Sequence, residues 1–71
     1  MALSRGAVLA RETMLRRVLS QTALERLTGI IQPTISRILA GKKIPTLAEA
    51  LALHRELGVP VEAWGTPGAG E

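Results

Sequence analysis

Residues 20–41 constrain the fold of this 71-residue chain more than any other stretch. Ser20 stands directly before an apolar pattern with helical spacing, and Gly29 follows that pattern. Serine is a favoured helix N-cap, and glycine readily adopts the left-handed conformation that closes a helix and turns the chain. A second helical pattern then runs up to Gly41. The segment predicts two short helices, over residues 21–28 and about 32–40, joined by a tight turn.

Three further helical segments are predicted around this pair. Ser4 can cap a helix over about residues 5–18, and Thr46 with Glu49 forms a capping box for a helix over about residues 47–57. Residues 59–64 predict a short helical turn. No strand pattern stands out. The sequence therefore predicts one all-α domain over residues 1–64, followed by a flexible Gly/Pro-rich tail over residues 65–71.

The apolar residues at helical spacing predict the core of this domain. The residues expected to face inward are Val8, Met14, Leu15, Val18, Leu19, Leu24, Leu27, Ile35, Ile38, Leu39, Leu47, Ala48, Ala50, Leu51 and Leu57. Trp64 is the only aromatic residue. It can fill the core against the fourth helix, or it can form an apolar patch at a dimer interface together with Val59 and Val61.

Composition limits the kinds of function that are open. The chain has no cysteine, no aspartate and one histidine, His54. It therefore offers no disulfide or thiolate metal site and little material for catalysis. We expect neither an enzyme nor a metal or cofactor site. No apolar run approaches the length of a membrane span, and charges interrupt the start of the chain where a signal peptide needs an apolar stretch. We expect a cytoplasmic protein.

Charge is distributed unevenly along the chain. Residues 1–44 contain eight Lys or Arg and two Glu, a balance of +6, whereas residues 45–71 contain one Arg and four Glu, a balance of −3. A basic part within one small domain is typical of proteins that bind a polyanion.

The predicted third helix lies in the basic part and carries polar side chains that a helical core does not require. Arg37 lies beside the apolar stripe of Ile35 and Ile38, where its guanidinium can pair with guanine O6 and N7. Gln32 can bond adenine or a phosphate. Two short helices with such a polar second member have the layout of a helix-turn-helix that binds double-stranded DNA. Basic residues near this helix are expected to contact phosphates: Lys42, Lys43 and Arg17.

These motifs resemble the helix-turn-helix family of the phage Cro and lambda-type repressors, which is called XRE-like. The resemblance covers about residues 14–64 and rests on the order and spacing of LSQTAL (19–24), LTGI (27–30), QPTISRI (32–38), AGKKIPTL (40–47) and LGVPV (57–61). It implies a compact five-helix domain that binds specific DNA sequences, usually as a dimer.

The resemblance also implies roles for single residues. Gln21 corresponds to a glutamine that grips a phosphate, and Thr34 with the Lys42–Lys43 loop falls where the family contacts the DNA backbone. The family places its base-reading side chains at the positions of Gln32, Pro33, Ser36 and Arg37.

Two positions depart from the family pattern. The family commonly pairs an arginine on the first helix with a glutamate near the end of the third, at the positions of Met14 and Leu39. An apolar pair in place of a buried ion pair is often neutral or stabilising. Ile31 stands where the family usually has a Ser or Thr that caps the recognition helix, and loss of such a cap costs about 1 kcal/mol. The sequence leaves open where this helix begins.

Together these features predict a bacterial or phage transcription regulator, a repressor that acts as a homodimer on a DNA operator. Two alternatives remain open. One is the DNA-binding antitoxin of a toxin–antitoxin pair, which has a protein partner. The other is a helix-turn-helix module that binds a protein and no DNA.

Overall fold

The computed structural model describes residues 4–65 of the chain. Its elements are α1 (Arg5–Arg17), α2 (Gln21–Thr28), α3 (Gln32–Leu39), α4 (Leu47–Leu57) and the short 3₁₀ helix η1 (Val61–Trp64). The all-α class is confirmed, with no strand in residues 4–65. The expected fifth helix is a four-residue 3₁₀ turn instead of an α-helix. Apart from Gly65, the predicted tail lies outside the described residues.

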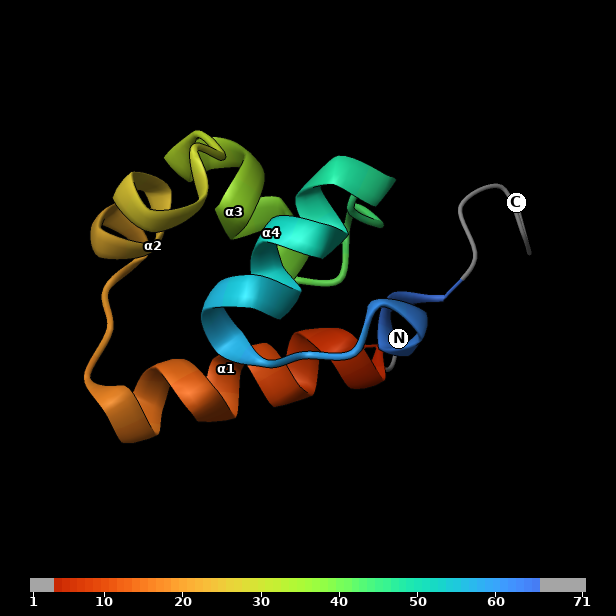
Figure 1. Ribbon diagram of the computed structural model, residues 1–71, viewed down its shortest axis with the longest axis horizontal. Helices are drawn as coiled ribbons and strands as arrows, with labels where there is room; N and C mark the ends of the chain where they lie inside the picture. The colour runs from red at the N-terminus through yellow and green to blue at the C-terminus, as the bar shows by residue number, and fades with distance from the viewer. Residues whose placement is uncertain (1–3, 66–71) are drawn as a thin grey trace.

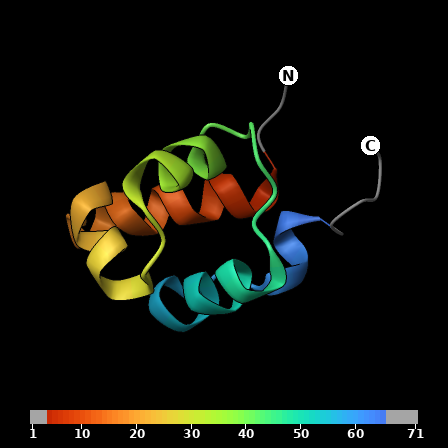
Figure 2. The same cartoon turned by 90° about the horizontal axis from the view of Figure 1, so that it is seen from above.

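The helices surround a single core. α1 runs along one side of the molecule, α2 and α3 lie on the opposite side, and α4 lies between them (Figure 1). Seen from above, α3 lies over α1 and η1 lies near the start of α1 (Figure 2). α3 packs on α1 and α2, while η1 packs on α1 and α4. None of the helices described here combines the length and the apolar character needed to cross a membrane.

The predicted helix boundaries are confirmed by their caps. The Ser4 and Ser20 side chains accept hydrogen bonds from backbone amides three residues later. Thr46 and Glu49 form the expected capping box at the start of α4. Gly29 and Gly58 close α2 and α4 in the left-handed conformation, at φ 77° and 73°. Local capping chemistry therefore defines these three helices, as the sequence indicated.

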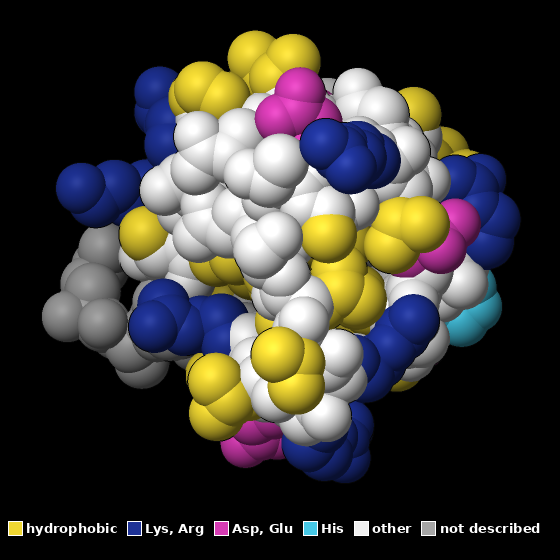
Figure 3. Space-filling view, turned by 90° about the vertical axis from the view of Figure 1, so that its left-hand side faces the viewer, with side chains coloured by type: hydrophobic (Ala, Val, Ile, Leu, Met, Phe, Trp, Pro, Cys, Tyr) yellow, Lys and Arg dark blue, Asp and Glu magenta, His cyan; other side chains and the backbone are white. Residues whose placement is uncertain are grey.

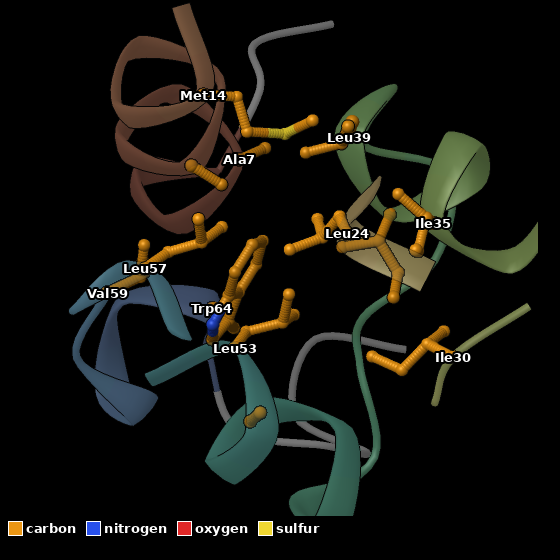
Figure 4. Close-up of a cluster of buried hydrophobic side chains, with 13 residues drawn as sticks. Ala7, Met14, Leu24, Ile30, Ile35, Leu39, Leu53, Leu57, Val59 and Trp64 are labelled. Atoms are coloured by element: carbon orange, nitrogen blue, oxygen red, sulfur yellow. The ribbon is translucent and has the colours of Figure 1, made fainter. Parts of the chain in front are cut away.

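The core combines side chains from all five elements. Leu24, Ile35, Ile38 and Leu39 are buried as predicted. Trp64 is 3% exposed, and its ring points into the cluster beside Leu53 and Leu24 (Figure 4). Of the two roles considered for Trp64, that of a core residue packed against α4 is confirmed.

The predicted inner face of α1 is partly wrong. Leu15 and Val18 are 83% and 91% exposed, and Val8 is 40% exposed. The helix instead buries Met14 and three small residues: Gly6, Ala7 and Ala10. At Gly6 the Trp64 ring occupies the space that a side chain would need. An alanine Cβ built at Gly6 would lie 2.5 Å from that ring.

Three other leucines are also more exposed than predicted. Leu27 is 43% exposed on α2, and Leu47 and Leu51 are 63% and 52% exposed on α4. Ala48 is exposed as well. α4 is apolar on more than one side, so its sequence pattern does not define which side is buried. The packed side carries Ala50, Ala52, Leu53 and Leu57.

Candidate nucleic-acid interface

The third helix is anchored by one face and leaves the other open. Ile35, Ile38 and Leu39 are buried in the core. At about 100° per residue, the four residues predicted to contact bases lie within an arc of about 140° on the opposite side. All four are exposed: Gln32, Pro33, Ser36 and Arg37. The structure therefore brings these side chains together on one accessible face.

Both ends of α3 are held by side chains from other helices. At its start, the backbone amide of Gln32 donates to a carboxylate oxygen of Glu25 on α2, at 3.1 Å. At its end, the guanidinium of Arg11 on α1 donates to the Leu39 carbonyl, at 3.2 Å. Neither of these two residues was predicted from the sequence. One sequence feature could have pointed to Glu25: Ile31 cannot cap α3, and it makes no side-chain cap hydrogen bond in the structure.

The start of α3 is now defined at Gln32, with Pro33 in its first turn. Proline is tolerated there because an amide in the first turn has no intrahelical acceptor. Glu25 supplies from α2 an acceptor for the first amide of α3, at a helix start where Ile31 offers no side-chain cap.

Gln21 and Gln32 form a direct pair across the turn. The Gln32 side-chain amide donates to the Gln21 side-chain oxygen, at 2.7 Å. Gln21 is the first residue of α2, where helix geometry leaves its amide and that of Thr22 free for an anion. Gln21, which is predicted to bind a phosphate, therefore orients Gln32, which is predicted to contact a base.

The loop after α3 contains the next basic residues. Lys42 is exposed, while Lys43 donates to the Glu49 carboxylate at 2.7 Å. Burial by itself raises the pKa of Glu49. Hydrogen bonds from Lys43 and Thr46, together with the charge of Lys43, outweigh burial and hold the pKa of Glu49 below its ordinary value. Lys43 therefore stabilises the start of α4, and Lys42 is the freer of the two cations.

Two other predicted phosphate contacts lie at different places. Thr34 is half-buried at the edge of the exposed face, and its amide donates to the Ile31 carbonyl at 3.0 Å. Arg17 donates to the Glu56 carbonyl at 2.6 Å, which ties the end of α1 to the end of α4. The structure does not bring Arg17 to the exposed face of α3.

A groove of about 640 Å³ runs between α1 and α3, next to the exposed face. Leu15 and Val18 border it on the α1 side, and Gln21 and Ser36 border it near the predicted contacts. Figure 3 shows apolar side chains within a hollow at this end of the molecule and Lys and Arg side chains around it. The surroundings of the hollow are predominantly basic, as the charge distribution indicated.

The residues proposed for a dimer interface differ in accessibility. Val59 and Trp64 are 2% and 3% exposed within the single chain, so the core already uses their side chains. Val61 is half-buried and retains accessible surface. Of the three, Val61 alone keeps surface that a second copy could contact.

His54 has a structural contact. Its Nδ1 lies 3.2 Å from the Val59 carbonyl oxygen, beyond the end of α4. Within residues 4–65, no group of three or more His, Cys, Asp or Glu is placed to hold a metal ion.

A family model described as helix-turn-helix matches residues 10–64, well over half of the chain. No curated protein and no solved structure gives a match. The family is one of DNA-binding regulatory domains rather than enzymes. Its matched range contains the paired helices α2 and α3, the Gln21–Gln32 contact and the exposed face described above. The chain belongs to the Cro and lambda-repressor-like, or XRE-like, helix-turn-helix family of DNA-binding regulators.

Proposed function

We propose that this protein is a sequence-specific repressor that binds double-stranded DNA as a homodimer and inserts α3 into the major groove. The observation that carries the proposal is the exposed face of α3, on which Gln32, Ser36 and Arg37 are accessible together. The fixed Gln21–Gln32 pair supports it, because a side chain that is held in place before binding loses less conformational freedom on the DNA.

Each exposed side chain has a specific task in this proposal. Arg37 donates two hydrogen bonds to guanine O6 and N7, and Gln32 contacts adenine or the backbone beside it. Pro33 can offer only apolar contact, for example to a thymine methyl. Phosphate contacts fix the register of the helix on the duplex. We assign these phosphate contacts to Gln21 and Lys42, with Thr34 at the edge of the face.

The dimensions of the domain fit one half of an operator. The structure measures 32 × 21 × 20 Å, and successive major grooves on one side of DNA are roughly 34 Å apart. Two copies can therefore occupy neighbouring half-sites without overlap. Repression then follows from occupancy, since a bound dimer excludes polymerase from the same DNA. Such a regulator acts in the cytoplasm, where bacterial or phage DNA lies.

A selection and a salt titration test this function. The protein is incubated with a pool of random duplexes of about two helical turns, and bound DNA is recovered and sequenced. We expect an enriched motif with two-fold symmetry. Affinity for it should fall steeply with salt, by about 0.9 in the log–log slope for each neutralised phosphate. An affinity independent of salt, or recovery of unenriched sequences, would contradict the proposal.

A further inference from the structure

The N-terminus of α3 has no free first-turn amide. Helix N-termini usually offer amides that bind phosphate. Here the Gln32 amide is bonded to Glu25, Pro33 has no amide hydrogen, and the Thr34 amide is bonded to the Ile31 carbonyl. By contrast, helix geometry leaves the amides of Gln21 and Thr22 at the start of α2 without an intrahelical acceptor. The two helices of the motif therefore differ in their capacity to bind an anion.

Glu25 places a negative charge where the domain is expected to meet phosphates. Its carboxylate lies 3.1 Å from the Gln32 amide, and Gln32 is in turn bonded to Gln21. Glu25 is half-buried, and it is one of only two glutamates in the basic part of the chain, residues 1–44. Like charges repel across distances within the Debye length, about 10 Å at 0.1 M salt.

We propose that Glu25 is a positioning and specificity-determining residue of the DNA interface. As a cap, its carboxylate fixes where α3 begins and so fixes the Gln32 side chain. As a charge, it opposes phosphate binding at this helix end and lowers affinity for DNA of any sequence. This repulsion is the same for every sequence, so the charge sets overall affinity, whereas the cap sets sequence preference through Gln32. This inference rests on the proposed function and concerns a residue that the base and phosphate contacts do not include.

Two substitutions separate the cap from the charge. Glu25→Gln keeps a side-chain oxygen for the Gln32 amide and removes the charge. We expect it to bind a mixed-sequence duplex about threefold to tenfold more tightly at roughly 50 mM salt, and the gain should vanish near 0.5 M salt. Its preference for the selected operator over the mixed-sequence duplex should be unchanged. Glu25→Ala removes the cap too, and we expect this preference to fall at least about fivefold.

Hydrogen exchange of the Gln32 amide reports on the cap without DNA. We expect slow exchange in the unaltered protein and in Glu25→Gln, and exchange at least about tenfold faster in Glu25→Ala. Glu62→Gln is the matched control for the charge. Glu62 is exposed on η1, which packs on α1 and α4 and not on α3. This variant should change affinity for the mixed-sequence duplex by less than about twofold.

Each result has one meaning. If Glu25→Gln binds no more tightly than Glu62→Gln, the charge role is wrong. If Glu25→Ala leaves Gln32 exchange and sequence preference unchanged, the cap role is wrong. If the unaltered protein binds no duplex, the proposed function fails, and the DNA part of this inference fails with it. Gln32 exchange still decides whether Glu25 caps α3.

Discussion

Gly6 lies directly under the only aromatic ring of the protein, which makes its replacement by alanine a sensitive test of the packing. A Cβ at this position would lie 2.5, 2.6 and 3.0 Å from three ring atoms of Trp64. The ring is 3% exposed, so it has little room to move away. Overpacking a core costs about 1–3 kcal/mol, and contacts this short favour the upper half of that range. Alanine in place of a helical glycine returns up to about 1 kcal/mol.

The net expectation for Gly6→Ala is a loss of about 1–2 kcal/mol of folding free energy. For a domain of this size, that corresponds to a fall in melting temperature of roughly 5–15 °C. Thermal and urea unfolding followed by circular dichroism measure the loss. Fluorescence of Trp64 should also shift to the red if the ring is displaced toward solvent.

A second background separates a clash from a general helix effect. In Trp64→Leu, the smaller side chain should leave space for the new methyl group. There Gly6→Ala should be neutral or stabilising, because only its helix propensity remains. If Gly6→Ala is stabilising in the unaltered protein, with unchanged fluorescence, the packing of η1 on α1 described here is incorrect.

Three further changes test other parts of the structure. Val18 ends α1 at φ 52°, a left-handed conformation that costs a non-glycine residue about 1–2 kcal/mol, and it is 91% exposed. Val18→Gly should therefore raise the unfolding free energy by about 0.5–1 kcal/mol, once the greater chain entropy of glycine in the unfolded state is subtracted. If urea titration gives Val18→Gly a lower unfolding free energy than the unaltered protein, Val18 is not strained. Leu39→Glu should cost about 3–5 kcal/mol, because it buries an unpaired carboxylate where Leu39 faces Met14 (Figure 4). Adding Met14→Arg should restore much of that loss in thermal unfolding, and absence of any recovery would show that the two positions are not coupled. The lowered pKa of Glu49 means that its ionised form stabilises the fold above about pH 4.5 and that this contribution is lost as pH falls through the lower folded value. In acid titration, Glu49→Gln should remove part of the loss of unfolding free energy seen below about pH 4.5. An unchanged pH profile would contradict the Lys43–Glu49–Thr46 network.

The parts of the fold that local chemistry determines could be read from the sequence. Ser20 and Gly29 define α2 because capping depends on residues adjacent in the chain. The exposed face of α3 was also predictable, since Ile35 and Ile38 leave one side of a short helix for polar residues. These features need no knowledge of how helices are arranged.

The buried side of α1 could not be read in the same way. Met14 and Leu15 are adjacent and similarly apolar, yet one is 7% and the other 83% exposed. Only the position of Trp64, fifty residues later, shows that the side with Gly6 and Ala7 faces inward. Gly6 illustrates the same point, because in sequence it weakens a helix and in the structure it makes room for a ring.

The role of Glu25 depends on tertiary geometry too. Its hydrogen bond to Gln32 spans seven residues and a left-handed turn at Gly29. The helix is interrupted between the two positions, so only the angle between α2 and α3 brings them together. The missing cap at Ile31 indicated that an acceptor was needed but not which residue supplies it.

The central claim is that the exposed face of α3 reads DNA bases, and Arg37→Ala tests it most directly. Arg55→Ala is the matched control, because it removes the same charge from α4, where the Arg55 side chain is 64% exposed. Operators are selected from random duplexes with both variants and with the unaltered protein. We expect Arg37→Ala to lose preference at one base pair in each half-site and about 1–3 kcal/mol of binding free energy, while Arg55→Ala keeps the motif. Identical motifs and affinities for the two variants would contradict the account.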